Sequence, residues 1–169
     1  MTTSVQQHRA EAPPSVRCAV VTVSDTRTLA TDTGGRTVAE RLVAAGHTLV
    51  ERYIIPDEPD RMRSLLHELQ QRPDVDAVLL TGGTGIASRD QTYETVWGLL
   101  TKPLPGYGEL FRTLSYAEIG AAAMLSRAVG GLLGRTVVLT MPGSTAAICL
   151  AMDKLILPEL GHLVREARR

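Results

Sequence analysis

Three short segments of the chain combine glycine with hydroxyl, carboxylate or basic side chains. They are residues 24–27 (SDTR), 81–90 (TGGTGIASRD) and 141–144 (MPGS). Hydroxyl groups, cationic side chains and freely exposed backbone N–H groups all bind phosphate oxygens. Each segment follows an apolar run that reads as a buried strand. The sequence therefore places phosphate-binding groups directly after strands.

The glycine-rich segment at residues 81–90 is the most informative of the three. Gly82, Gly83 and Gly85 permit positive φ and let a ligand approach the backbone closely. Their amides could form a concave nest for phosphate oxygens, to which Thr84 adds a hydroxyl. The segment is neither a Walker A loop nor the GxGxxG dinucleotide fingerprint. Two interpretations stay open: a phosphate site of another kind, or a tight strand-to-helix turn.

The loop at residues 142–144 precedes an apolar, helix-like run. Ser144 or Thr145 would cap that helix, and a helix N-terminus favours a bound anion. A plain helix cap without a ligand is the alternative.

Four further side chains are candidates for the same site. Asp57 lies between two prolines and Asp90 follows the glycine-rich loop, so each alone suits a turn or cap. If both reach a bound phosphate, they suit Mg²⁺, which takes hard oxygen ligands and keeps several waters. Glu109 would be either a first-turn residue or a ligand contact. Arg127, after Ser126, would pair with phosphate, with carboxylate, or in a surface ion pair.

The elements that must position these residues alternate along the chain. We expect strands at residues 17–24, 48–55, 76–81 and 136–140. We expect helices at 34–45, from a cap at Asp60, at 92–100, from a capping box at Ser115 and Glu118, from 144, and around Pro158. This order predicts an α/β fold with a parallel sheet and helices on both faces. The carboxyl ends of its strands would bring the three segments together at one edge.

Composition restricts the class of protein. The 169 residues fit one domain, and 18 basic residues balance 18 acidic ones, so no net field attracts nucleic acid or a membrane. No CxxC pair or histidine cluster indicates zinc or a nucleophilic triad. Residues 1–15 are polar and are expected to form a disordered tail. Residues 16–169 would form the single domain of a cytoplasmic protein.

Six motifs in order carry a family resemblance: VTVSDTR, IPDE, TGGTGIASRD, PGYGELFR, EIGAAAMLSRAV and MPGS. In this order they resemble the MoaB/MogA family of molybdenum cofactor biosynthesis proteins, over nearly the whole chain outside the tail. The resemblance implies a three-layer α/β/α fold with a mostly parallel sheet, assembled as homotrimers or homohexamers. It also implies transfer of AMP from ATP to molybdopterin, with release of pyrophosphate. The product then receives molybdate on a different protein or domain.

The resemblance also assigns roles to individual residues. Asp57 and Asp90 match the two family aspartates and would be the catalytic pair that holds Mg²⁺. The pterin and nucleotide would be bound by Asp25, Gly82, Gly83, Thr84, Gly85, Glu109, Ser126, Arg127, Pro142, Gly143 and Ser144. Gln91 and Tyr93 depart from the Val and Pro that many members carry, and Tyr93 could reshape the loop after Asp90.

Two other functions are compatible with these residues. One is a non-catalytic protein that binds or carries molybdopterin in the same pathway. The other is a nucleotide-handling domain related to competence-damage proteins, whose PGYGE and LSRAV-like segments are similar in part. Retention of both Asp57 and Asp90 favours the adenylyltransferase.

Overall fold

The computed structural model describes residues 11–169, and a single sheet runs through them. Its six strands lie in the order β2-β1-β3-β6-β5-β4. The strand bounds are β1 (Arg17–Val23), β2 (Thr48–Ile55), β3 (Ala77–Thr81), β4 (Lys102–Pro103), β5 (Gly130–Leu133) and β6 (Thr136–Met141). Strands β2, β1, β3 and β6 pair in parallel, whereas β5 and β4 continue the sheet antiparallel.

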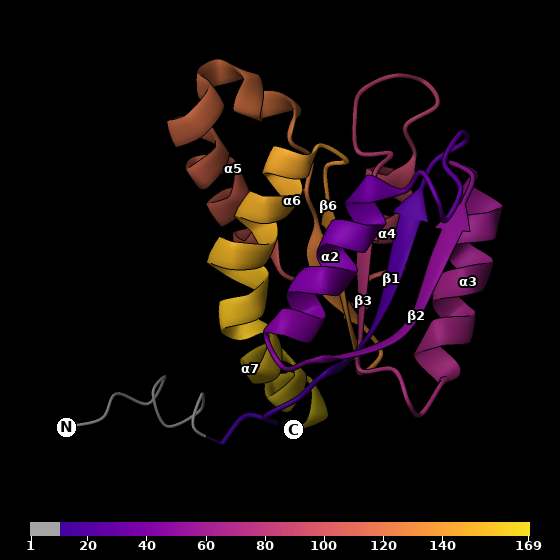
Figure 1. The fold of residues 1–169 in the computed structure, drawn as a ribbon, viewed down its shortest axis with the longest axis vertical. Coiled ribbons are helices and arrows are strands. Elements are labelled where there is room, and N and C mark those ends of the chain that lie inside the picture. The colour runs from indigo at the N-terminus through magenta and orange to yellow at the C-terminus, as the bar shows by residue number, and fades with distance from the viewer. Residues whose placement is uncertain (1–10) are drawn as a thin grey trace.

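Helices cover both faces of this sheet (Figure 1). Their bounds are α2 (Thr33–Ala44), α3 (Pro59–Gln71), α4 (Thr92–Leu99), α5 (Pro105–Ile119), the 3-10 segment η1 (Gly120–Leu125), α6 (Thr145–Ala151), the π-helical η2 (Met152–Ile156) and α7 (Leu157–Arg168). Helices α2, α5 and α6 to α7 enclose one core, and α3 and α4 enclose the other. The expected three-layer α/β/α fold with a mostly parallel sheet is confirmed.

The central strands are apolar because they are covered on both sides. Every residue of β3 and β6 is buried. Their side chains alternate between the two cores: Leu79 and Leu139 face one, and Leu80 and Val138 face the other. Such continuous apolar runs are typical of parallel strands between two helical layers.

Two expected helix starts are wrong. Ser115 does not open a helix; it is buried inside α5, which begins ten residues earlier at Pro105, where proline suits the first turn. Phe111 and Ser115 lie one turn apart on its buried side. Asp60 does not cap α3, because Pro59 already begins that helix, and the cap position is Glu58.

Strands β4 and β5 were not expected from the sequence. β5 is a GGLL segment of four residues, and β4 has two residues, one of them Pro103. Glycine and proline both disfavour strands, so neither segment carries a strand pattern. Gly131 is required here because a Cβ would come within 2.5 Å of the Lys102 carbonyl oxygen.

Most of the expected disordered tail, residues 1–10, lies outside the described residues. The remainder, residues 11–15, runs along the domain. Glu11 forms an ion pair with Arg165 of α7, and the Ser15 hydroxyl lies 3.2 Å from that of Thr48. Across residues 11–169, no helix combines the length and the apolar character needed to cross a membrane.

Candidate functional site

The three segments singled out in the sequence meet where β1, β3 and β6 end. Thr22 of β1 pairs with Thr81 of β3, which pairs with Met141 of β6. Beyond the strands, the Gly82 amide donates to the Met141 carbonyl at 3.2 Å, and the Thr81 hydroxyl donates to the Pro142 carbonyl at 3.3 Å. The predicted convergence at one edge of the sheet is therefore present. In Figure 1 the long loop between β3 and α4 extends beyond this edge.

Two glycines at the start of this loop have conformations that other residues rarely adopt. Gly82 has φ of 97° and Gly83 has φ of 62°. A Cβ on Gly82 would lie 2.3 Å from the Val23 carbonyl oxygen, and one on Gly83 would lie 2.3 Å from Oδ2 of Asp57. Glycine is thus needed both for the backbone angles and for the close approach of Asp57 to the loop.

Asp57 is a nearly buried carboxylate at this edge, with 5% of its surface exposed. Its Oδ1 accepts the Gln91 amide at 3.1 Å, and its own amide donates to Oδ1 of Asp25 at 3.1 Å. Burial raises the pKa of Asp57; the Gln91 N–H opposes this, and the charges of Asp90 and Asp25 add to it. The site thus holds more negative charge around Asp57 than its own partners neutralise.

Asp25 joins the loop after β1 to the glycine-rich loop. Both of its oxygens accept from Arg89, each at 2.8 Å. These bonds to Arg89 first, and the bond from the Asp57 amide second, lower the pKa of Asp25 to about 2. The Asp25 and Arg89 side chains keep 40% and 56% of their surface exposed, so the pair remains accessible to a ligand.

Asp90 folds back onto the glycine-rich loop. Its Oδ2 accepts the Ala87 amide at 3.0 Å, and a Cβ on Gly85 would come within 2.5 Å of the same oxygen. Asp90 therefore holds the tip of the loop in shape and places a second acidic group near Asp57.

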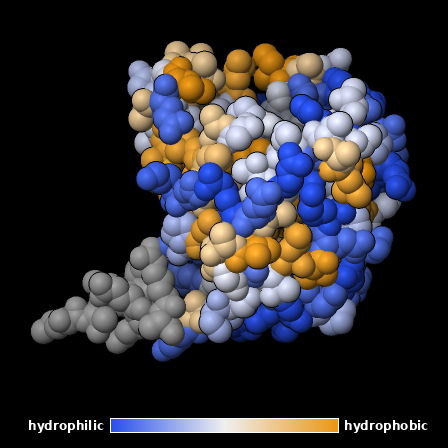
Figure 2. Space-filling view, viewed as in Figure 1, coloured by the Kyte–Doolittle hydropathy of each residue, from blue (hydrophilic) through white to orange (hydrophobic). Residues whose placement is uncertain are grey.

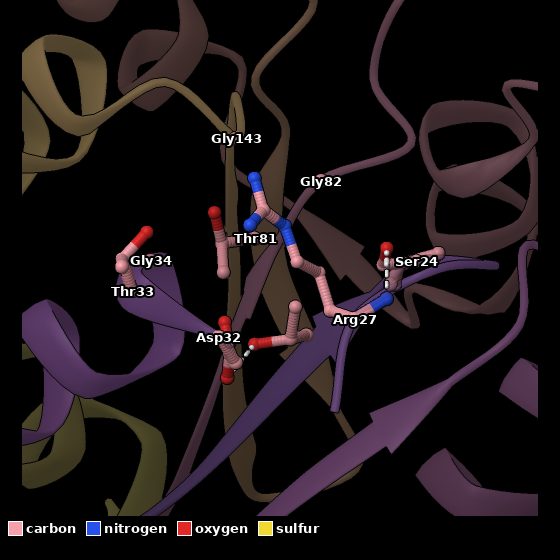
Figure 3. Close-up of a pocket in the computed structure, with 10 residues that line it drawn as sticks. Ser24, Arg27, Asp32, Thr33, Gly34, Thr81, Gly82 and Gly143 are labelled. Carbon is pink, nitrogen blue, oxygen red and sulfur yellow. Dashed lines mark hydrogen bonds between the residues drawn. The ribbon is translucent and has the colours of Figure 1, made fainter. Parts of the chain in front are cut away.

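A cavity of about 110 Å³ opens beside these loops. Its lining comes from the ends of β1 and β3, the loop after β1, the start of α2 and the loop after β6: Thr22, Val23, Ser24, Arg27, Asp32, Thr33, Gly34, Thr81, Gly82 and Gly143. Figure 3 shows the Arg27 side chain reaching across this cavity toward Gly82 and Gly143. A cation over glycine amides is a suitable environment for a phosphate group.

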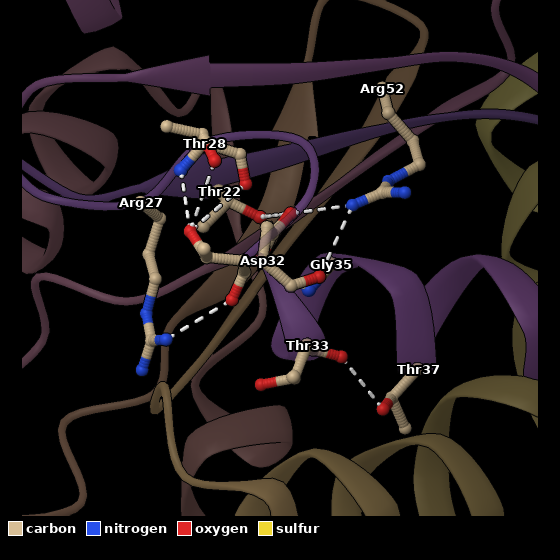
Figure 4. Close-up of polar contacts among 9 residues, drawn as sticks. Thr22, Arg27, Thr28, Asp32, Thr33, Gly35, Thr37 and Arg52 are labelled. Carbon is tan, nitrogen blue, oxygen red and sulfur yellow. Dashed lines mark hydrogen bonds and ion pairs between the residues drawn. The ribbon is translucent and has the colours of Figure 1, made fainter.

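The sequence prediction missed three residues of this cavity, Asp32, Thr33 and Gly34, and included Arg27 only as part of the segment at residues 24–27. Asp32 is buried and caps α2, with Oδ1 accepting the Gly35 amide at 2.8 Å. Its Oδ2 accepts the Thr22 hydroxyl at 2.9 Å and Arg52 at 2.7 Å (Figure 4). The signal was an aspartate three residues before a glycine amide, which is N-cap spacing.

The Pro142–Ser144 loop lies on the other side of the cavity. The Ser144 hydroxyl accepts the Ala147 amide at 3.3 Å, so the expected cap of α6 is confirmed. Gly143 packs against Gly82, whose Cα would lie 3.5 Å from a Cβ at position 143. The two glycine-containing loops are thus in direct contact.

Arg127 supports the glycine-rich loop from behind. Its Nε donates to the Thr84 carbonyl at 3.0 Å, it also bonds the Gly85 carbonyl, and it forms an ion pair with Glu94. Its guanidinium lies 5.1 Å from the centre of the Tyr93 ring. Of the partners expected for Arg127, the structure contains the ion pair.

The neighbours of Arg127 are also engaged within the protein. Ser126 is buried, with 8% of its surface exposed, and its amide donates to the Ala123 carbonyl. The Tyr93 ring stacks on Trp97, with 6.1 Å between ring centres. Tyr93 thus joins the packing behind the loop, together with Arg127.

Glu109 lies apart from this cluster. It is exposed in the first part of α5 and lines a separate cavity of about 110 Å³ with Trp97 and Arg112. The structure brings together the other predicted groups around the glycine-rich loop but gives Glu109 no bond to it.

The acidic side chains at this edge could hold a divalent cation only together with other ligands. Residues 11–169 contain no group of three or more His, Cys, Asp or Glu side chains that could hold a metal by themselves. Asp57 and Asp90 supply carboxylate oxygens of the kind that Mg²⁺ prefers, and such an ion would have to take its remaining ligands from phosphates and water. The Thr92 hydroxyl, buried without a partner against the same Gly83, is a further oxygen at this point.

Comparison with known proteins agrees with this geometry. The family described as "Probable molybdopterin binding domain" matches residues 19–162. The molybdenum cofactor biosynthesis protein B of Halalkalibacterium halodurans is 52% identical over 164 residues, covering 96% of each chain.

Solved structures match over the same length. A crystal structure of a molybdenum cofactor biosynthesis protein B has a TM-score of 0.90 at 52% identity, covering 94% of this chain and 99% of that one. The tungsten cofactor synthesizing protein MoaB of Pyrococcus furiosus has a TM-score of 0.83 at 34% identity, covering 94% and 100%. The chain belongs to the molybdopterin-binding-domain family that includes these MoaB proteins.

Proposed function

We propose that the chain acts in molybdenum cofactor biosynthesis by transferring AMP from ATP to molybdopterin. An oxygen of the molybdopterin phosphate attacks the α-phosphorus of ATP, a new P–O bond forms, and the bond to the pyrophosphate oxygen breaks. Adenylylated molybdopterin and pyrophosphate are the products. The attacking phosphate is already ionised near neutral pH, so the reaction needs no strong general base.

The main barrier to this reaction is repulsion between the two anionic reactants. The protein can lower it by aligning them and by offsetting their charge. Arg27 and the amides of the glycine-rich loop would bind phosphate oxygens at the cavity. Asp57 and Asp90 would hold Mg²⁺. When bound, that ion supplies positive charge to the phosphates.

The observation that carries the proposal is the state of Asp57. Asp57 is a buried carboxylate with a raised pKa, and the charges of Asp25 and Asp90 contribute to this rise. It also lies against Gly83, where there is no room for a side chain. Carboxylates whose pKa is shifted by burial and by neighbouring charges are enriched at functional sites. A positively charged ligand at this place would relieve the repulsion.

The test is pyrophosphate release by the purified chain, given ATP, Mg²⁺ and molybdopterin. Asp90→Asn should lower turnover about 100-fold or more and should leave molybdopterin affinity close to that of the wild type. The matched control is Asp60→Asn, an exposed carboxylate in the first turn of α3, which should change neither quantity. Equal losses of turnover and affinity in Asp90→Asn would contradict a catalytic role.

The same assay separates the alternatives. A chain that binds molybdopterin but releases no pyrophosphate would be the non-catalytic carrier. A chain that binds no molybdopterin would support the nucleotide-handling domain related to competence-damage proteins. The arrangement of Asp57 and Asp90 around the glycine-rich loop favours the adenylyltransferase over both.

We also propose that the chain assembles as a homotrimer or homohexamer in the cytoplasm. Large apolar side chains are exposed on α5 and η1: Leu110, Tyr116, Ile119, Met124 and Leu125. Figure 2 shows apolar surface gathered over this part of the molecule. Apolar patches of this kind support contact with another protein surface, and light scattering would give the mass of the assembly.

A further inference from the structure

Thr92 carries an unusual hydroxyl group. Its side chain is completely buried, yet Oγ1 has no hydrogen-bond partner; Arg52 Nε is the other such buried atom in residues 11–169. The Thr92 amide is satisfied, because it donates to the Gly83 carbonyl at 3.0 Å. Buried polar groups are nearly always hydrogen-bonded, and an unpaired one destabilises the fold. Stability of the fold therefore does not explain why a hydroxyl group is present at this position.

The position of this hydroxyl suggests the reason. Oγ1 of Thr92 and Oδ2 of Asp57 both lie against Gly83, at 2.4 and 2.3 Å from the point that a Cβ would occupy there. The other oxygen of Asp57, Oδ1, already accepts the Gln91 amide. One side of the carboxylate is thus fixed, and the other lies near a donor that has no bond.

We propose that Thr92 is a positioning residue for Asp57. Its hydroxyl donates to Oδ2 of Asp57 when that carboxylate holds a divalent cation bound with a nucleotide triphosphate. The carboxylate is then fixed through both oxygens, by the Gln91 amide and by the Thr92 hydroxyl. Carboxylates that hold metals are usually oriented by such outer hydrogen bonds. This inference rests on the proposed function, because it requires a cation at Asp57.

The proposal makes an unusual prediction for Thr92→Val. Valine has the shape of threonine without the hydroxyl, so the exchange removes an unpaired buried group and should leave the thermal midpoint of the ligand-free protein unchanged or higher. The same exchange should weaken binding of Mn²⁺–ATP about tenfold, within the range measured for loss of a metal's outer hydrogen bonds. A merely structural threonine would show the opposite pattern, with lower stability and unchanged binding.

Two further variants serve as controls for Thr92→Val. Thr92→Ser keeps the hydroxyl and should bind Mn²⁺–ATP nearly as well as the wild type. Thr95→Val removes a hydroxyl from another buried threonine, one turn along α4, and should leave binding unchanged.

In the experiment, Mn²⁺–ATP is titrated with the full chain, and binding is followed by the relaxation rate of water protons. Thermal unfolding of each variant is recorded separately, without ligand. Weaker binding in Thr92→Val at equal or higher stability, with binding kept in Thr92→Ser, is the expected result. Equal binding in Thr92→Val and the wild type, or a lower midpoint for Thr92→Val, would overturn the role of Thr92. Failure of the wild type itself to bind Mn²⁺–ATP would instead overturn the cation site of the proposed function, and with it this inference.

Discussion

Each end of the parallel strands has a buried aspartate beside it, and the two aspartates have opposite electrostatic surroundings. Asp76 precedes β3 and is 8% exposed, and Asp57 follows β2 and is 5% exposed. Asp76 accepts the Arg17 amide at 3.0 Å and two bonds from the Arg17 guanidinium, and it pairs with Arg168 at 2.5 Å. Asp57 has no arginine of its own and accepts one amide at its Oδ1.

The pKa values of the two carboxyl groups move in opposite directions as a result. Burial acts to raise the pKa of Asp76, but the bonds from Arg17 outweigh it, and the pKa is lowered. At Asp57 burial dominates, the charges of Asp90 and Asp25 add to it, and the pKa is raised. Similar burial thus gives a stabilising ion pair at one edge and an uncompensated charge at the other. Residues that break local rules in this way are typical of functional sites.

The largest expected effect comes from Asp57→Asn. Turnover should fall about 100- to 1,000-fold, because the variant loses a charge that holds Mg²⁺. Stability at neutral pH should be unchanged or higher. A carboxyl group with a raised folded pKa contributes stability below its unfolded pKa, near 3.9, and this is lost as the pH rises through the folded pKa. Assays of pyrophosphate release and thermal unfolding check both, and a clear loss of stability at pH 7 would contradict the comparison.

The next effect belongs to Asp76→Asn and concerns stability alone. The variant should lose about 2 kcal/mol of unfolding free energy at neutral pH, because charged hydrogen bonds to a buried group are lost. For the wild type, a lowered folded pKa means that this contribution is present above the unfolded pKa, near 3.9, and is lost as the pH falls through the folded value. Urea unfolding at pH 7 measures the change.

The control for that experiment is Asp74→Asn. Its side chain is 50% exposed and pairs with Arg72, so its removal should lower the unfolding free energy much less than the removal of Asp76 does. Similar losses of unfolding free energy in Asp74→Asn and Asp76→Asn would show that the buried ion pairs of Asp76 stabilise the fold no more than an exposed ion pair does.

The smallest effect is expected for Arg89→Gln. The Arg89 pair with Asp25 is exposed, so thermal stability should hardly change. The pKa of Asp25, now lowered to about 2 chiefly by Arg89, should rise toward its ordinary value, near 3.9. An NMR titration of the Asp25 carboxyl group would follow this rise. A pKa that stays near 2 would mean that other partners, such as the Asp57 amide, hold Asp25 ionised.

The edge of the sheet at which the candidate site lies could be predicted, because the ends of buried strands can be recognised in a sequence. The apolar runs at β1, β3 and β6 are followed by serine, glycine and proline, respectively, and parallel pairing places these strand ends together. The partners of individual side chains could not be predicted. Arg127 forms an ion pair with Glu94 and hydrogen bonds to the carbonyls of Thr84 and Gly85, which are 43 and 42 residues away in the sequence. The Arg27 side chain lines a cavity that forms only when the chain folds. Such contacts depend on packing and leave no local pattern.

The boundaries of the elements show the same limit. β5 was missed because it begins with two glycines, which are required by close neighbours from other parts of the chain: Leu139 and Tyr107 at Gly130, and the Lys102 backbone at Gly131. The start of α5 was misplaced because a capping-box spacing at Ser115 occurs by chance inside a longer helix that Pro105 begins. In both cases contacts in the folded protein, rather than local sequence preferences, determine where the element lies.

The proposed function is tested most simply by pyrophosphate release from the wild-type chain with ATP and Mg²⁺, measured with and without molybdopterin. We expect release that depends on molybdopterin, because the acidic groups and glycine amides at this edge of the sheet would bring two phosphates together. No release in a sample that demonstrably binds molybdopterin would contradict it, and the uncompensated charge of Asp57 would then belong to a site that binds without catalysing.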